Sequence, residues 1–269
     1  MRKKILFFAM TLLLLTGITA SADVLGEQNG GWSTYMGAFT YFHNVQFNSD
    51  SVGKQNEYYV EYTPNEDAVP IVVNGASIWG TRNIKQAEQY MQENGLRPLA
   101  GINADYFSFK TGIPMGYTIA DGEIISKEYG GQDAVGFRSD GTGFIKWLDI
   151  QTTVTDGEKS IDVMYINKWC QAGFDPVYLL TDKFGKKRQK AQSECIFVIC
   201  TPNEGRLHVD ETMSLTVDDV FIYNGEIEIP EGKVVLLMDT SGVSEYYDFL
   251  EADFTQVSTL TVANQAGRR

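Results

Sequence analysis

The sequence predicts an α+β fold built on a dominant mixed or antiparallel β-sheet with a few helices. Three observations support this prediction: many short runs rich in β-branched and aromatic residues, Asp-Gly pairs between consecutive runs, and one helical segment with capping signals at both ends. The 269 residues are 43% hydrophobic, which is enough for the packed core of one large domain or two small ones.

The N-terminal residues 1–22 have the layout of a secretory signal peptide. A basic start at residues 2–4 precedes an apolar run at residues 5–15, and Ala-Ser-Ala follows at residues 20–22. The apolar run is shorter than the roughly 20 residues that span a bilayer, so we expect cleavage after Ala22. The mature protein is then expected to be secreted or to lie at the exterior of the cell envelope, with no stable membrane span.

The chain is acidic, with a formal charge of -13. Removal of residues 1–22 takes away three basic residues and no acidic one, which lowers the formal charge to -16. An acidic protein repels phosphate backbones, so we expect no nucleic-acid partner.

Residues 23–55 are rich in Gly, Asn and Ser, so we expect an irregular segment there and a structured domain at residues 56–269. Strands are expected in that domain wherever β-branched and aromatic residues gather, with Asp121-Gly122 and Asp140-Gly141 as tight hairpin turns. The expected strands are 57–63, 70–73, 98–102, 116–120, 123–126, 134–137, 143–150, 194–200 and 233–239.

One helix is expected over residues 84–94. Asn83 and Gln86 form a capping box at its start, and Gly95 is a natural stop at its end. The apolar runs on either side of this helix complete a β-α-β unit. The segment that follows is therefore expected to begin where a strand ends.

The sequence lacks the residues that several enzyme classes require. Two histidines, and three cysteines without metal-type spacing, are too few for a zinc site or a Ser-His-Asp triad. The run Asp239–Gly242 resembles one half of an aspartic protease pair, but no second such run follows an apolar strand. Neither a phosphate-binding loop nor a G-x-G-x-x-G motif after a strand is present.

The three cysteines leave their pairing open. Cys195 and Cys200 lie on one expected strand, roughly 17 Å apart, so they cannot pair with each other. Either can pair with Cys170, and buried free thiols are the alternative.

Functional residue types concentrate between Gly101 and Ile124. Asn103 and Asp105 lie two residues apart just past an expected strand, so their side chains point to the same side if the backbone stays extended. Asp105 can act as an electrostatic stabiliser or nucleophile at a sugar, with Asn103 as its orienting partner. On residue types alone, the stronger interpretation is that both side chains satisfy the amides of local turns.

The residues expected to bind substrate follow in the same segment. Aromatic side chains supply an apolar wall, and a turn rich in Gly and Pro lets the backbone approach a ligand. The plainer alternative is that Phe107 and Phe109 belong to the core. The expected binding residues are Tyr106, Phe107, Thr111, Gly112, Pro114 and Gly116.

This segment resembles the hallmark of the phosphodiester glycosidase domain family. Members typically show Asn-x-x-aromatic-Phe at a strand end, then Thr-Gly-x-Pro-x-Gly and an Asp-Gly hairpin. The corresponding runs here are Asn-Ala-Asp-Tyr-Phe at 103–107, Thr-Gly-Ile-Pro-Met-Gly at 111–116 and Ile-Ala-Asp-Gly-Glu-Ile at 119–124. The resemblance continues, less specifically, over residues 57–75, 134–145, 161–185 and 226–242.

The resemblance implies an exported hydrolase that cleaves a sugar of the N-acetylglucosamine type from a sugar-1-phosphodiester at the anomeric carbon. It implies a charged role for Asp105 and substrate orientation by Asn103. A phosphate leaving group has little need of a strong general acid, so the enzyme must mainly stabilise the cationic sugar. Family members continue into Asp-Gly-Arg and Leu-Asp-Gly-Gly-Gly-Ser elements that this sequence lacks, so we expect residues 56–269 to be the N-terminal portion of an incomplete domain.

Two alternatives stay open. In the first, the chain is a non-catalytic exported carbohydrate-binding or cell-envelope-associated protein. In the second, its site holds a divalent cation, Ca²⁺ or Mg²⁺, between Asp105 and neighbouring carbonyls. A glycan or a sugar phosphate is the expected partner in each case.

Overall fold

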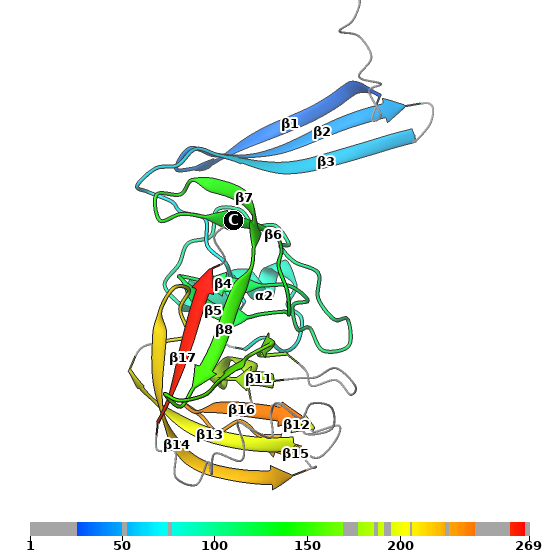
Figure 1. Ribbon diagram of the computed structural model, residues 1–269. Coiled ribbons are helices and arrows are strands. Elements are labelled where there is room, and N and C mark those ends of the chain that lie inside the picture. Colours follow the sequence, from blue (N-terminus) through cyan, green and yellow to red (C-terminus); the bar gives the residue numbers. More distant parts are fainter. Residues whose placement is uncertain are drawn as a thin grey trace, which may run out of the picture. The chain divides into compact units, whose positions relative to one another are not determined.

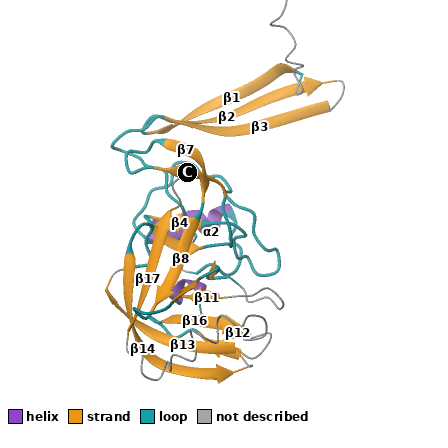
Figure 2. Cartoon of the chain, viewed as in Figure 1, coloured by secondary structure: helices purple, strands orange, loops and turns teal. Residues whose placement is uncertain are grey.

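A computed structural model of the chain describes residues 26–49, 53–74, 77–168, 177–185, 188–190, 195–204, 206–223, 226–239 and 259–266 (Figure 1). The expected signal peptide lies outside these residues. The chain divides into two compact units, Met1–Asp67 with Leu99–Gly101, and Ala68–Pro98 with Ile102–Arg269. Strands dominate the described part, as Figure 2 shows, and none of its helices has the length and apolar character needed to cross a membrane. The expected β-dominated α+β fold is confirmed.

The first unit contains a three-stranded antiparallel sheet in the order β1-β2-β3 (Figure 1). The strands are β1 (Glu27–Gly37), β2 (Thr40–Ser49) and β3 (Gly53–Tyr62). The expectation that residues 23–55 are irregular is therefore wrong over most of that segment. The domain start expected at residue 56 also falls inside β3.

The prediction failed here because the first hairpin has no recognisable turn sequence. Ala38 and Phe39 join β1 to β2 with φ angles of 45° and 52°. Two positive φ angles make the tight turn that matches the twist of a hairpin, a role usually filled by Asn-Gly. Cross-strand aromatic contacts such as Tyr35 with Tyr41, ring centroids 5.0 Å apart, offset the weak strand propensity of Gly, Asn and Ser.

The expected helix is confirmed as α2 (Ile84–Glu93). Asn83 accepts a hydrogen bond from the backbone N of Gln86 at 3.0 Å, and the Gln86 side chain accepts one from Asn83 N at 2.9 Å. Gly95 follows the helix with a φ of 78°, the left-handed conformation that commonly ends helices. Local capping chemistry therefore determines both ends of α2.

The expected β-α-β unit is wrong, because residues 70–73 and 98–102 form no strand. Each run begins with a proline, which has no N–H to donate to a sheet. Ile71 is 49% exposed and Ile102 is 79% exposed, so apolar burial does not offset the entropy cost of ordering these runs. The candidate segment therefore does not begin at the end of a strand.

The second unit is built on an eight-stranded sheet in the order β10-β11-β16-β13-β14-β17-β8-β9. The β10–β11 pair is parallel and the other pairs are antiparallel, so the sheet is mixed. Its strands are β8 (Ile150–Thr155), β9 (Ser160–Asp162), β10 (Tyr165–Ile166), β11 (Val177–Leu180), β13 (Cys195–Glu204), β14 (Thr212–Tyr223), β16 (Val234–Asp239) and β17 (Thr259–Ala266).

The central strands β11, β16 and β13 are buried on both faces. On β16, Leu236 packs into one buried cluster and Leu237 into the other. This explains why residues 234–238 form an uninterrupted apolar run, as in other sheets covered on both sides. The run ends at Asp239, and residues 240–242, the rest of the protease-like run, lie outside the described residues.

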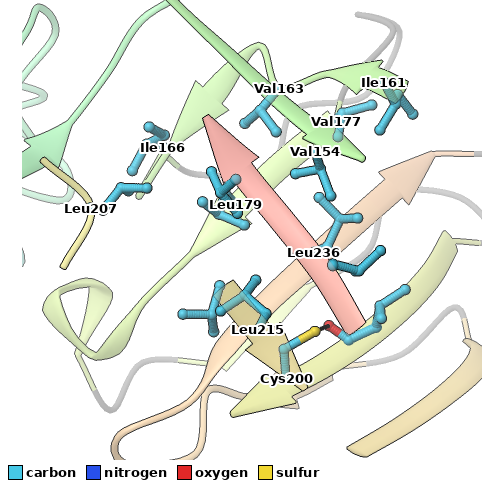
Figure 3. Packing of buried hydrophobic residues seen from close by; sticks show 14 of the residues in the cluster. Val154, Ile161, Val163, Ile166, Val177, Leu179, Cys200, Leu207, Leu215 and Leu236 are labelled. Atoms are coloured by element: carbon cyan, nitrogen blue, oxygen red, sulfur yellow. Dashed lines mark hydrogen bonds between the residues drawn. The ribbon is translucent and has the colours of Figure 1, made fainter. Parts of the chain in front are cut away.

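The eight-stranded sheet curls, because strands from opposite ends of its order contribute side chains to one buried cluster (Figure 3). The chain between β9 and β10 joins the two edges. Val163 N donates to Thr152 O of β8, next to one edge, at 2.8 Å, and Met164 N donates to Val177 O of β11, next to the other, at 3.0 Å. We call this junction the seam of the sheet.

Both expected Asp-Gly turns are confirmed. Asp121 and Gly122, with φ angles of 51° and 77°, join β4 to β5, and Asp140-Gly141 lies between β6 and β7. The shorter elements are β4 (Thr118–Ala120), β5 (Glu123–Ser126), β6 (Gln132–Phe137), β7 (Gly143–Leu148), the 3₁₀ helix η1 (Asp182–Phe184), β12 (Arg188–Lys190) and β15 (Glu226–Glu228).

Two of the three cysteines lie within the described residues. Cys195 and Cys200 are buried in β13, and Cys200 is a free thiol. Burial, together with the nearby Asp218 carboxylate, raises the pKa of Cys200 to about 12. Cys170 lies outside the described residues.

Candidate functional site

The candidate segment forms a small hairpin of two short arms. Met115 N donates to Tyr106 O at 2.8 Å, and Ser108 N donates to Ile113 O at 2.9 Å. The Asn-Ala-Asp-Tyr-Phe and Thr-Gly-Ile-Pro-Met-Gly runs therefore supply opposite arms of one structure. We call residues 105–116 the motif hairpin.

Gly112 is required at the turn of the motif hairpin. Its φ is 80°, and its N donates to Ser108 O at 2.7 Å. A Cβ on Gly112 would collide with the carbonyl group of Gly80, whose N donates to Thr111 O at 2.8 Å. The close backbone approach expected at Gly112 is thus to residue 80 of the same chain.

Asp105 ties the two arms of the motif hairpin together. Its Oδ1 accepts a hydrogen bond from Tyr106 N at 2.7 Å, and its Oδ2 accepts one from Gly116 N at 2.8 Å. A Cβ on Gly116 would lie 2.7 Å from Asp105 Oδ2, so a side chain there would displace the carboxylate. Asp105 therefore satisfies local turn amides, as the plainer interpretation of the sequence has it.

A buried lysine binds the second arm. Lys168 is 6% exposed, and its Nζ donates to the carbonyl oxygens of Pro114 at 2.6 Å, Met115 at 3.0 Å and Gly116 at 2.9 Å. Glu128 Oε2 lies 3.5 Å from the same ammonium. Burial lowers the pKa of Lys168 to about 8, although the Glu128 charge acts in the opposite direction. One ammonium thus serves three consecutive carbonyls.

The preceding residue positions Lys168. Asn167 is fully buried, and its φ of 52° is unusual for a residue other than glycine. Its Nδ2 donates to Ile125 O at 2.8 Å, and its Oδ1 accepts from Thr181 N at 2.8 Å. Asn167 thereby links β5 to the end of β11 and directs the chain toward the motif hairpin.

The sequence prediction omits Lys168, Asn167 and Glu128. Asn167 and Lys168 lie about 50 residues after the motif hairpin and reach it through the pairing of β5, β10 and β11, whereas Glu128 lies two residues after β5. A lysine two residues after the strand-like pair Tyr165–Ile166 is a usable signal, because lysine is rarely buried without a specific partner.

Asn103 and Asp105 do not share the geometry expected from the sequence. That expectation required an extended strand, and residues 98–102 do not form one. Asn103 lies on exposed, irregular backbone ahead of the motif hairpin, and within the described part of the chain no hydrogen bond joins its side chain to Asp105. An orienting role for Asn103 stays a prediction.

The aromatic residues of the motif hairpin face solvent. Tyr106 is 84% exposed, Phe107 is 37% exposed and Phe109 is 95% exposed. The rings of Phe107 and Phe109 contact each other edge to face with centroids 5.4 Å apart. The alternative that these two phenylalanines belong to the core is wrong, and an exposed apolar wall is present.

Thr111 and Pro114 shape the hairpin from within. Thr111 Oγ1 accepts a hydrogen bond from Ile113 N at 3.3 Å, and the carbonyl of Pro114 is bound by Lys168. Ile113 itself is buried in the second core cluster. The hairpin is therefore fastened to the core at its centre and bound by an ammonium on its second arm.

The carbonyls expected as cation ligands are bound by the Lys168 ammonium. The described residues contain no group of three or more His, Cys, Asp or Glu side chains arranged to hold a metal ion. Asp105 is an exposed carboxylate beside carbonyls that already have a cationic partner.

Comparison with known proteins extends the fold assignment. No protein-family model and no curated protein matches the sequence. A solved structure that resembles this one is the crystal structure of a hypothetical protein from Synechocystis, with a TM-score of 0.64 and 14% sequence identity. The match covers 89% of this chain but 42% of the other, so this chain spans less than half of that protein's length. At this identity the likeness shows a shared fold alone.

Proposed function

We propose that this chain is an exported hydrolase that cleaves a sugar of the N-acetylglucosamine type from a sugar-1-phosphodiester, with the motif hairpin as part of its sugar site. One observation supports the proposal most strongly. The two runs that resemble the phosphodiester glycosidase family are joined by Asp105, whose oxygens lie 2.7 Å and 2.8 Å from the amides of Tyr106 and Gly116. The residues of these two runs therefore assemble into one hairpin.

The chemistry of this reaction suits a carboxylate held by backbone amides. Loss of the phosphate leaves positive charge at the anomeric carbon, and a pre-oriented negative charge stabilises it without reorganisation. Asp105 is exposed at the surface of the motif hairpin, so a bound sugar can approach its free lone pairs. In the proposal Asp105 is the catalytic residue, and Asn103 orients the substrate.

The aromatic wall supplies binding to the sugar. Tyr106 and Phe107 can cover the apolar face of a sugar ring, as aromatic side chains do in ligand sites. Thr111, Gly112, Pro114 and Gly116 have their polar or backbone groups engaged within the hairpin or with Lys168, so they shape the site. Lys168 is a positioning residue that holds the second arm.

The test is hydrolysis of a methyl phosphodiester of N-acetylglucosamine 1-phosphate by the full chain, followed as release of free sugar. We expect Asp105→Asn to lower kcat by about 100-fold or more, because it removes the stabilising charge. Asp133→Asn, at an exposed position of β6, is the matched control and should retain activity. Unchanged kcat in Asp105→Asn, or no sugar release by the unmodified chain, would overturn the proposal.

A second variant separates catalysis from loss of structure. Tyr106→Ala removes a side chain that is 84% exposed, so the melting temperature should stay unchanged while KM rises. A fall in kcat with no change in KM would contradict the binding role of Tyr106.

The alternative function is a non-catalytic glycan-binding or cell-envelope-associated protein. Exposed aromatic side chains on the β1–β3 sheet favour it, since they are unusual in a protein without a partner: Trp32, Tyr35, Tyr41, Tyr58 and Tyr59. Glycan binding without sugar release in the same assay would select this alternative.

A further inference from the structure

One face of the β1–β3 sheet carries an ordered grid of aromatic and polar side chains. Tyr35 pairs with Tyr41 across β1 and β2, and Ser33 pairs with His43. On the other side of β2, Tyr41 lies opposite Glu61 and His43 lies opposite Tyr59. Alternate residues of a strand point to the same face, so these side chains share one surface. We call it the Tyr-His face: Ser33, Tyr35, Tyr41, His43, Tyr59 and Glu61.

The rings of the Tyr-His face form a continuous row across all three strands. The ring centroids are 5.0 Å apart for Tyr35 and Tyr41, 6.1 Å for Tyr41 and His43, and 4.5 Å for His43 and Tyr59. The three tyrosines remain 58%, 40% and 39% exposed. The row is therefore supported from the side by its own ring contacts and open to solvent above.

Polar contacts fix the centre of the row. Ser33 Oγ lies 2.7 Å from His43 Nδ1, and Glu61 Oε2 lies 3.1 Å from His43 Nε2. The Ser33 hydrogen bond and stacking on Tyr59 orient the His43 ring, with the Glu61 carboxylate beside it. Such order before binding lowers the entropy cost of holding a ligand.

The charge of this unit restricts its partners. Acidic side chains outnumber the basic ones in the described residues 26–49 and 53–67, where Lys54 is the basic residue and Glu61 lies within the Tyr-His face. A phosphate-bearing or otherwise anionic partner would be repelled. The exposed rings belong to tyrosine and histidine, which combine an apolar body with a polar tip. This combination suits a ligand that has apolar C–H faces, many hydroxyl groups and no charge.

We propose that the Tyr-His face binds a neutral glycan through stacking on its aromatic row and hydrogen bonds from its polar tips. The surface lies on β1, β2 and β3, and none of its residues belongs to the motif hairpin. The site therefore adds a binding function that does not depend on the proposed hydrolysis.

The same residues do not form a hydrolytic triad. A serine, a histidine and a glutamate are in contact, but His43 Nε2 makes no hydrogen bond of proper geometry, although Glu61 lies 3.1 Å away. A triad requires the carboxylate to orient the histidine through such a bond. The cluster is therefore assigned to binding rather than to nucleophilic catalysis.

The test is titration of the untagged full chain with chitotetraose and with cellotetraose, observed by NMR at the histidine rings. The chain has two histidines, so His208 provides an internal reference. We expect the ring signals of His43 to shift with saturation and those of His208 to stay in place. Failure of both sugars to shift His43, or equal shifts at both histidines, would overturn the proposal.

Adjacent tyrosines on β3 provide a matched pair of variants. Tyr59→Ala removes a ring from the Tyr-His face, whereas Tyr58→Ala removes an exposed ring from the opposite face of the same strand. We expect Tyr59→Ala to weaken glycan binding about tenfold and Tyr58→Ala to leave it within about twofold. Equal losses in the two variants would contradict the assignment to this face, and so would tighter binding of polygalacturonate, a polyanion.

The result is distinguishable from failure of the proposed hydrolase. Asp105→Asn should lower the rate of sugar release by about 100-fold or more and leave the shift of His43 intact, because Asp105 lies outside the Tyr-His face. Loss of both properties in this variant would contradict two independent sites.

Discussion

Replacement of Lys168 by methionine tests how the motif hairpin is held. Methionine is close to lysine in length and apolar volume, but it has no N–H to donate. The variant therefore removes three hydrogen bonds, to the carbonyls of residues 114–116 at 2.6 to 3.0 Å, and the contact with Glu128 at 3.5 Å. Asp105 and its two amide contacts are not altered directly.

Two opposing terms decide the effect on the free energy of unfolding. A buried carbonyl left without a donor costs about 1–3 kcal/mol. Two of the three hydrogen bonds are part-buried and one is buried, so the lower half of the summed range applies, roughly 3–5 kcal/mol. The folded state of the variant no longer buries a charge. Because burial lowers the lysine pKa from 10.5 to about 8, removal of the buried charge stabilises the folded variant by about 3 kcal/mol at pH 7. The net destabilisation is about 0–2 kcal/mol.

The local effect should be much larger than this net value. The free energy gained by no longer burying a charge stabilises the folded state as a whole. The three lost hydrogen bonds, in contrast, all held the second arm of the motif hairpin. We expect amide hydrogen exchange at Gly116 and Tyr106 to become at least about tenfold faster, while exchange in β13 and β16 changes little. Lys110→Met, at an exposed position in the turn of the same hairpin, is the control. Unchanged exchange at Gly116 in Lys168→Met, or equal acceleration in the control, would refute the reasoning.

The pH dependence of stability gives an independent check. The folded-state pKa of Lys168 lies below the unfolded value, and so does that of Lys127. Between pH 8 and 10.5 the unfolded chain binds more protons than the folded one, so stability contributed by these groups rises as the pH rises through that window. Burial raises the pKa of Tyr117 and Tyr165, which opposes the trend near and above pH 10. Urea unfolding between pH 7.5 and 9.5 should show a smaller rise for Lys168→Met than for the unmodified chain.

Two further predictions concern the hairpin turn and the core. Gly112→Ala should lower the free energy of unfolding by about 2 kcal/mol or more, because alanine is strained at a φ of 80° and its Cβ meets the Gly80 carbonyl. Gly143→Ala is the control, and a denaturation curve of Gly112→Ala that matches the control would contradict this prediction. Cys200 should resist alkylation in the folded protein at pH 8, since its pKa is about 12 and it is buried; peptide mapping that finds Cys200 modified without denaturant would contradict this.

The sequence was sufficient where short-range chemistry determines the backbone. The helix at residues 84–93 is set by a capping box and a terminal glycine, and the hairpins at residues 121–122 and 140–141 are set by Asp-Gly pairs. The doubly buried strand at residues 234–239 is set by its uninterrupted apolar run. In each case the determining residues lie within a few positions of the structure they produce.

The sequence was insufficient where distant residues decide the result. Ala38 and Phe39 adopt left-handed conformations because pairing of β1 with β2 requires them, and neither residue signals a turn. The run 98–102 has strand-like composition but finds no partner strand. Only the pairing of β5, β10 and β11 brings Lys168 to the motif hairpin, although the residues it binds lie about 50 positions earlier. The sequence therefore predicts the site residues that belong to a local motif. It does not predict those, such as Lys168, that the sheet topology brings to the site.

The two buried lysines, Lys127 and Lys168, both donate hydrogen bonds to backbone carbonyls of nearby segments. Lys127 donates from Nζ to the carbonyls of Val163 at 2.8 Å and Met164 at 3.1 Å, where the seam passes from one sheet edge to the other. Carbonyls at such transitions have no strand partner, and burial makes their satisfaction obligatory. The backbone of Lys127 also pairs with Ile166, two residues before Lys168.

Closure of the sheet and placement of the motif hairpin thus depend on a few neighbouring residues that directly follow β5 and β10: Lys127, Asn167 and Lys168. A substitution that opens the seam should therefore loosen the hairpin as well. The hairpin is fastened to the sheet at two points, through Ile113 in the core and through Lys168, two residues after β10.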